Sequence, residues 1–165
     1  MGDVGKLSSC LDRLGGLDLT TLENRKLLQK RIYLLQAFGL DLGYRFGWYI
    51  YGPYSPDLTR DAFDLSIQLR HASDTVYKES LTSQERSIIK KFKEFLSSIS
   101  GTGEPAERLE LLASLYFLAK ENPSLSKKTD VTSKLAELKA GRFSNSEIAQ
   151  AMKQLLTYGL IRFRH

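Results

Sequence analysis

Residues 44–58 read YRFGWYIYGPYSPDL, and this stretch decides the fold more than any other part of the chain. The period-2 alternation predicts an aromatic strand with two faces, one of which carries Tyr44, Phe46, Trp48 and Ile50. Gly52-Pro53 predicts a turn after the strand. Ser55-Pro56-Asp57 predicts a helix start, because serine suits the N-cap and proline the first helical position. An aromatic strand among helices either braces a small domain or presents its side chains to a partner.

Hydrophobic periodicity predicts helices outside this strand, at about 22–38, 56–71, 83–99, 106–120, 130–140 and 145–158. Three capping boxes support their starts: Thr20 with Glu23, Thr82 with Glu85, and Ser144 with Glu147. The first helix should turn six side chains toward solvent: Arg25, Lys26, Gln29, Lys30, Tyr33 and Gln36. Gly159 suits a helix C-terminus, and residues 160–163 could add a short strand. The expected fold is mainly α with a small β element, and winged-helix-like or helix-turn-helix-like.

The chain breaks most clearly at residues 100–105, SGTGEP. This break predicts a helical lobe over 20–100, with the aromatic strand and its turn, and a basic helix-turn-helix-like lobe over 105–165. We expect the two lobes to pack as one domain, preceded by a flexible lead-in over 1–19.

The composition, with 42% hydrophobic residues, suits a chain that buries a core. The apolar runs are too short for a membrane span, and the N-terminus does not read as a secretory signal. Cys10 is the only cysteine, so an internal disulfide is excluded and a cytoplasmic location is expected.

The net charge of +5 arises entirely in the last quarter of the chain, where residues 122–165 carry 8 Lys or Arg against 3 Asp or Glu. Such an excess indicates either phosphate contacts or a solvated basic face. The candidate nucleic-acid-binding residues are Lys127, Lys128, Lys134, Lys139, Arg142, Lys153, Arg162 and Arg164.

No catalytic motif, metal site or cofactor site is expected. The two histidines, His71 and His165, and Cys10 do not have metal-ligand spacing. A Cys10–His71 nucleophile pair is conceivable, but a cation also suits the end of a helix at His71. Residues 101–103, GTG, lack the Gly-Lys-Ser/Thr of a phosphate-binding loop and read as a linker.

The helix motif NRKLLQKRIYLLQ at residues 24–36, followed by YRFGWYIYGPYSPDLTRD at residues 44–61, resembles the prokaryotic YwgA-like family. It is more distantly similar to Panacea-type antitoxin domains, in which a valine more usually follows the Gly-Pro. The resemblance covers about a quarter of the chain, around residues 22–62. It implies a mostly helical, winged-helix-like protein without enzymatic activity that serves regulation, toxin neutralisation or phage defence.

Two functions are therefore expected. The first is a nucleic-acid-binding regulator of a prokaryotic or mobile-element system, with DNA as the partner. The second is an antitoxin or phage-defence adaptor that docks a toxin or defence effector through the aromatic strand, with a homodimer possible in either case. Tyr, Trp and Arg are enriched at interface hot spots, although Trp48 and the tyrosines could also serve core and turn packing. The candidate partner-binding residues are Arg45, Trp48, Tyr49, Tyr51, Gly52, Pro53, Tyr54, Ser55 and Asp57.

Overall fold

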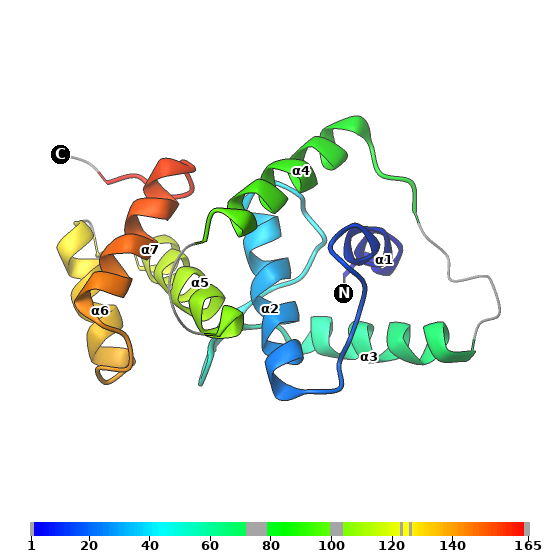
Figure 1. Ribbon diagram of the computed structural model, residues 1–165, viewed down its shortest axis with the longest axis horizontal. Coiled ribbons are helices and arrows are strands. Elements are labelled where there is room, and N and C mark those ends of the chain that lie inside the picture. The colour runs from blue at the N-terminus through cyan, green and yellow to red at the C-terminus, as the bar shows by residue number, and fades with distance from the viewer. Residues whose placement is uncertain (1, 72–78, 100–103, 123, 126, 164–165) are drawn as a thin grey trace. The chain divides into compact units, whose positions relative to one another are not determined.

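The computed structural model describes residues 2–71, 79–99, 104–122, 124–125 and 127–163. The described residues form seven helices and a two-stranded antiparallel sheet, so the protein is mainly α with a small β element, as predicted (Figure 1). The chain divides into two compact units, Met1–Ser98 and Ile99–His165, beside the break predicted at residues 100–105. Residues 100–103, with the predicted GTG linker, lie outside the described residues. None of the described helices is long and apolar enough to cross a membrane.

The first unit holds four of the helices and the sheet. Its elements are α1 (Val4–Arg13), α2 (Leu22–Ala37), β1 (Gly47–Tyr49), β2 (Gly52–Tyr54), α3 (Pro56–His71) and α4 (Ser83–Ser97). Helix α2 contacts both β2 and α4, and α1 contacts α3. Their apolar faces form a core whose fully buried side chains include Leu7, Cys10, Ile32, Leu34, Leu35, Leu58, Ala62, Phe92 and Phe95. The helices predicted at 22–38, 56–71 and 83–99 are thus confirmed, with small shifts at their ends.

Helix α1 occupies most of the segment for which the sequence predicts a flexible lead-in. Asp3 caps it, since its Oδ1 accepts a hydrogen bond from the Lys6 backbone N at 3.0 Å. Leu7, Cys10 and Leu11 share one helix face and are buried. Burying a large apolar side chain contributes about 1.5–3 kcal/mol, so this face favours a docked helix over a free segment.

The N-cap of helix α2 lies one residue after the predicted capping residue, Thr20. Thr21 is the N-cap, and its Oγ1 accepts a hydrogen bond from Asn24 N at 3.1 Å. The Thr20 hydroxyl instead donates to Asp18 Oδ1 at 2.6 Å. The prediction of a capping box at Thr20 and Glu23 is therefore wrong, although the helix predicted to follow it is present.

The aromatic segment is a hairpin, not a single strand that ends in a Gly-Pro turn. Strand β1 pairs with β2 so that Tyr49 lies opposite Gly52, and Ile50 and Tyr51 form the turn between them. Gly52 follows with φ 92°, a left-handed conformation that glycine adopts readily and that often closes such turns. Gly52 and Pro53 thus belong to β2. Ile50 therefore lies in the turn and not on a strand face, and its side chain is 85% exposed.

The described residues of the second unit form a cluster of three helices, α5 (Pro105–Glu121), α6 (Lys128–Leu138) and α7 (Asn145–Thr157). Both α6 and α7 pack against α5, and the buried core includes Leu109, Leu112, Leu115, Val131, Leu135, Ile148, Met152 and Leu155. Gly159 ends α7 with φ 71°, as predicted, and Leu160 N donates to Leu155 O at 3.0 Å. The strand predicted at 160–163 does not form, because a strand needs a paired neighbour and the described residues of this unit contain none.

The other predicted helix caps are confirmed. Thr82 with Glu85 and Ser144 with Glu147 form reciprocal capping boxes at the starts of α4 and α7. Ser55 caps α3 through a 3.3 Å hydrogen bond from Leu58 N to its Oγ. These caps are encoded within four residues of sequence, which explains why they can be predicted without a tertiary structure.

Candidate partner-binding site

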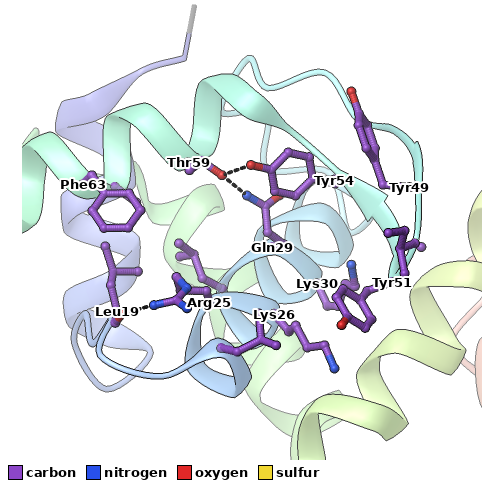
Figure 2. A pocket seen from close by; sticks show the side chains of 15 residues that line it. Leu19, Arg25, Lys26, Gln29, Lys30, Tyr49, Tyr51, Tyr54, Thr59 and Phe63 are labelled. Atoms are coloured by element: carbon purple, nitrogen blue, oxygen red, sulfur yellow. Dashed lines mark hydrogen bonds between the residues drawn. The ribbon is translucent and has the colours of Figure 1, made fainter.

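A pocket of about 400 Å³ lies in the first unit between the hairpin, α2 and α3, and most of its surface is apolar (Figure 2). In Figure 2, Leu19 and Phe63 lie at one end of the pocket, Tyr49 and Tyr51 lie at the other, and Gln29 lies between. The lining residues are Leu19, Leu22, Arg25, Lys26, Leu28, Gln29, Lys30, Tyr49, Ile50, Tyr51, Gly52, Tyr54, Thr59, Ala62 and Phe63.

Two polar side chains of α2 hold the hairpin in place. Gln29 Oε1 accepts from Ser55 N at 2.9 Å, and its Nε2 donates to Ser55 O at 3.2 Å. Lys30 Nζ donates to the Pro53 carbonyl oxygen at 2.8 Å. Gln29 and Lys30 are buried, so the prediction that they face solvent is wrong. Buried backbone groups require partners, and these two side chains supply them to the chain from Pro53 to Ser55.

Tyr33, also predicted to face solvent, is buried as well. Its ring packs edge-to-face on Phe46, with 4.9 Å between the ring centroids. The aromatic side chains of the hairpin segment are therefore partly structural.

The inner wall of the pocket continues the same hydrogen-bond network. Gln29 Nε2 donates to Thr59 Oγ1 at 2.9 Å, and Thr59 Oγ1 lies 2.8 Å from Tyr54 Oη. The Tyr49 ring packs edge-to-face on the Tyr54 ring, with 5.0 Å between centroids. Tyr54 is therefore fixed by contacts on both sides, and it gives Tyr49 a firm support.

The tip of the hairpin exposes three apolar or aromatic side chains beside the pocket. Tyr49 and Tyr51 are 49% and 37% exposed, and Ile50 is more exposed than either. Phe63 of α3 also leaves 42% of its surface exposed. Single exposed apolar residues are ordinary, but a cluster that borders an apolar pocket is typical of a binding surface.

The pocket carries positive charge at its wall and rim. Lys26 Nζ lies 3.9 Å from the centroid of the Tyr51 ring and 3.6 Å from Glu23 Oε1. Arg25 Nη1 donates to the Leu19 carbonyl oxygen at 2.9 Å. Because a carbonyl oxygen has no net charge, this contact does not neutralise the guanidinium group. With Lys30, three cations line the pocket, and no Asp or Glu is among the described residues that line it.

The structure brings only part of the predicted partner-binding set together. Tyr49, Tyr51, Gly52 and Tyr54 line the pocket, whereas Arg45, Trp48, Pro53, Ser55 and Asp57 are not among the lining residues. Pro53 and Ser55 are buried, Trp48 is half-buried, and Arg45 is exposed. Asp57 forms an ion pair with Arg60 on the surface of α3.

Sequence reasoning missed the walls of the pocket that α2 and α3 supply. Arg25, Lys26, Thr59 and Phe63 all line it. Phe63 carried a usable signal, since it lies off the buried stripe of α3 that Leu58, Ala62 and Leu65 form. A large aromatic side chain outside the buried stripe of a helix is a candidate for a binding surface.

The predicted basic residues of the second unit do not form one continuous surface. Lys127, Lys128 and Arg162 line a shared hollow of about 630 Å³ with Thr129, Leu156, Ile161 and Phe163. Lys153 is exposed on α7, and Lys134 lies 3.7 Å from Glu137 on α6. Arg164 lies outside the described residues.

Lys139 and Arg142 belong instead to a charge cluster around Glu110, whose side chain is 1% exposed. Arg142 Nη1 donates to Glu110 Oε2 at 2.6 Å, and Lys139 Nζ lies 3.5 Å from the same oxygen. Lys139 is itself buried. These two cations therefore balance a buried carboxylate, which is a structural role independent of any phosphate contact.

The burial and the pKa of Cys10 bear on whether Cys10 and His71 could act as a nucleophile pair. Cys10 is buried in the first unit, and burial raises the pKa of its thiol to about 12. A thiol in this state is a poor nucleophile. The described residues contain no group of three His, Cys, Asp or Glu side chains that could hold a metal ion.

The motif that carries the resemblance to YwgA-like proteins has a clear place in the structure. Residues 51–58 span the end of the hairpin turn, β2 and the first turn of α3. The geometry thus explains why Gly52 and Ser55 suit their positions, and the family itself stays a prediction. Comparison of the chain with protein-family models, with curated proteins and with solved structures finds no match.

Proposed function

We propose that the protein is a non-enzymatic binding protein whose first unit docks a segment of a partner protein at the hairpin pocket. The pocket volume lies within the range of about 300–1,000 Å³ that is usual for ligand sites. The site of contact would extend from the pocket onto Tyr49, Ile50 and Tyr51. The resemblance described above suggests a toxin or a defence effector as the partner.

The observation that carries this proposal is the exposed hairpin tip beside an apolar pocket. Ile50 is 85% exposed, so its side chain contributes little to the stability of the isolated chain. Its burial in a complex would contribute about 1.5–3 kcal/mol to the free energy of binding. Gln29 and Lys30 fix the hairpin backbone beneath this tip. A pre-formed site of this kind loses little conformational entropy on binding.

Affinity purification with wild-type and variant proteins tests the proposal. Ile50→Asp places a charge at the centre of the exposed tip, and aspartate is well tolerated in turns, so the fold should persist. We expect a partner protein that co-purifies with the wild type from its native host to be lost with Ile50→Asp.

Ile67→Asp is the matched control, because Ile67 is 48% exposed on α3 and does not line the pocket. It should retain the partner. Equal recovery with all three proteins, at matched thermal stability, would mean that the hairpin tip is not the docking surface.

A second candidate function is nucleic-acid binding by the second unit, with α6 and α7 acting as a helix-turn-helix-like pair. The hollow that Lys127, Lys128 and Arg162 share favours it, because clustered cations are what phosphate contacts require. A winged-helix fold, with DNA as the ligand, is the finer form of this proposal.

Fluorescence anisotropy with a random-sequence duplex tests this second candidate. Binding should weaken steeply between low and near-physiological salt, and Lys128→Glu should weaken it more than Lys93→Glu, an equal charge change at an exposed site on α4. Charge reversal at Lys139 or Arg142 is unsuitable, because both pair with Glu110 and their loss would perturb the fold. If the two variants weaken binding equally, the hollow is not the nucleic-acid-binding site.

A further inference from the structure

We infer that the segment docked in the hairpin pocket is acidic: a bulky apolar side chain enters the pocket, and neighbouring Asp or Glu side chains meet its cationic rim. This inference rests on the proposed docking function and names the chemistry of the partner. Its basis is the contrast between the apolar surface of the pocket and the charges set into that surface.

The charge at the pocket has one sign. Arg25, Lys26 and Lys30 line it, and its described lining residues include no carboxylate. Lys30 is buried and donates to the Pro53 carbonyl oxygen, so the charges that can meet a partner's acids are those of Arg25 and Lys26. Lys26 pairs with Glu23, whose side chain is 51% exposed and whose Oε1 lies 3.6 Å from Lys26 Nζ. Because 3.6 Å is longer than a close charge-assisted hydrogen bond of about 2.7–2.9 Å, a partner's carboxylate can take the place of Glu23.

The arrangement of Lys26 explains how one site can take both an apolar group and an anion. The Lys26 side chain is only 11% exposed, with its ammonium group over the Tyr51 ring. The lysine stem therefore adds to the apolar wall while its charged end lies at the aromatic rim. A basic segment would meet like charge here, and like charges disfavour the wrong partner.

The exposed tip argues for a polypeptide occupant over a small molecule. The apolar surface does not end inside the pocket but continues over Ile50 and Tyr49 to the outside of the hairpin. A segment of a protein can fill the pocket with one side chain and cover the tip with the next, and aromatic anchors next to a pocket are usual in such interfaces.

Selection of binders from a displayed library of short random peptides tests the inference on the full-length protein. Peptides that bind the wild type but not Ile50→Asp should be enriched in a bulky apolar residue next to Asp or Glu. When such a peptide is resynthesised with Asn and Gln in place of its acids, its affinity should fall about three- to tenfold at low salt. The difference should shrink as salt is added, because exposed charges are screened.

Lys26→Glu should invert this preference, so that the neutral peptide binds better than the acidic one. Lys90→Glu is the matched control, an exposed lysine on α4 that should leave the preference unchanged. Thermal unfolding of each variant checks that it is folded, and Lys26→Gln gives an intermediate case if the reversal is destabilising.

The outcomes separate the two conclusions. If the binding of the selected peptides requires Ile50 but is equally tight after their acids are replaced, the inference of an acidic segment is wrong and the proposed docking function is retained. If no selected peptide depends on Ile50, the pocket does not dock a peptide and both conclusions are wrong.

Discussion

Replacing Gln29 with alanine tests whether side chains of α2 hold the hairpin. The Ser55 N–H loses the acceptor 2.9 Å away, whereas Ser55 O keeps a hydrogen bond from Thr59 N at 3.2 Å. An unpaired buried N–H costs about 1–3 kcal/mol, and the lost hydrogen bond to Thr59 adds about 1 kcal/mol. The cavity left by the side chain acts in the same direction. Gln29→Ala should therefore lower the free energy of unfolding by at least about 2–4 kcal/mol.

Urea unfolding followed by far-ultraviolet circular dichroism measures this change. Gln68→Ala is the matched control: it makes the same replacement at an exposed position of α3 and should shift stability by less than about 0.5 kcal/mol. Amide exchange at Ser55 should also accelerate in Gln29→Ala relative to the wild type. A loss below about 1 kcal/mol, with unchanged exchange at Ser55, would refute the conclusion that Gln29 holds the hairpin.

Three further predictions follow from the buried and charged groups. Glu110→Ala removes the carboxylate 3.5 Å from the buried Lys139 ammonium group and should destabilise the protein by about 3–5 kcal/mol in urea unfolding; a loss under about 1 kcal/mol would contradict the charge cluster. Because burial raises the pKa of Cys10 to about 12, a thiol reagent at mildly alkaline pH should modify the native protein more than about a hundredfold more slowly than the urea-unfolded chain, and equal rates would show the thiol to be accessible. The hydrogen bond from the Thr82 backbone lowers the pKa of Glu85 in the folded protein. The ionised Glu85 side chain therefore stabilises the fold fully above the usual Glu pKa of about 4.3, and this stabilisation is lost as the pH falls through the lower pKa of the folded state. Melting temperatures of the wild type and Glu85→Gln should therefore differ at neutral pH and converge in acid, and a constant difference would contradict the assignment.

Local features of the chain could be predicted from its sequence. The capping residues Thr82, Ser55 and Ser144 act on backbone groups within the same helical turn, so their pattern is visible without knowledge of the rest of the fold. The stripes of α2, α3 and α4 were likewise visible in the spacing of apolar residues. The mainly helical class therefore follows from short-range information.

Long-range pairings could not be predicted in the same way. Gln29 and Lys30 look like solvent-facing residues because their hydrogen-bond partners, Ser55 and Pro53, lie 26 and 23 positions away in the sequence. Arg142 looks like a phosphate ligand because its carboxylate partner, Glu110, lies 32 positions away. In each case a polar side chain satisfies a buried group that only the tertiary structure brings near, and the composition of the local segment does not reveal it.

The position of Trp48 makes the hairpin observable by spectroscopy without any label. It is the only tryptophan in the sequence, it is half-buried on β1, and its neighbour in that strand, Tyr49, lines the pocket. Tryptophan emission from the whole protein therefore comes from a single place, a few ångströms along the chain from the proposed docking surface. With a candidate partner that lacks tryptophan, a change in emission colour or intensity on mixing reports on the hairpin alone, and titration of that signal yields an affinity for the unmodified chain.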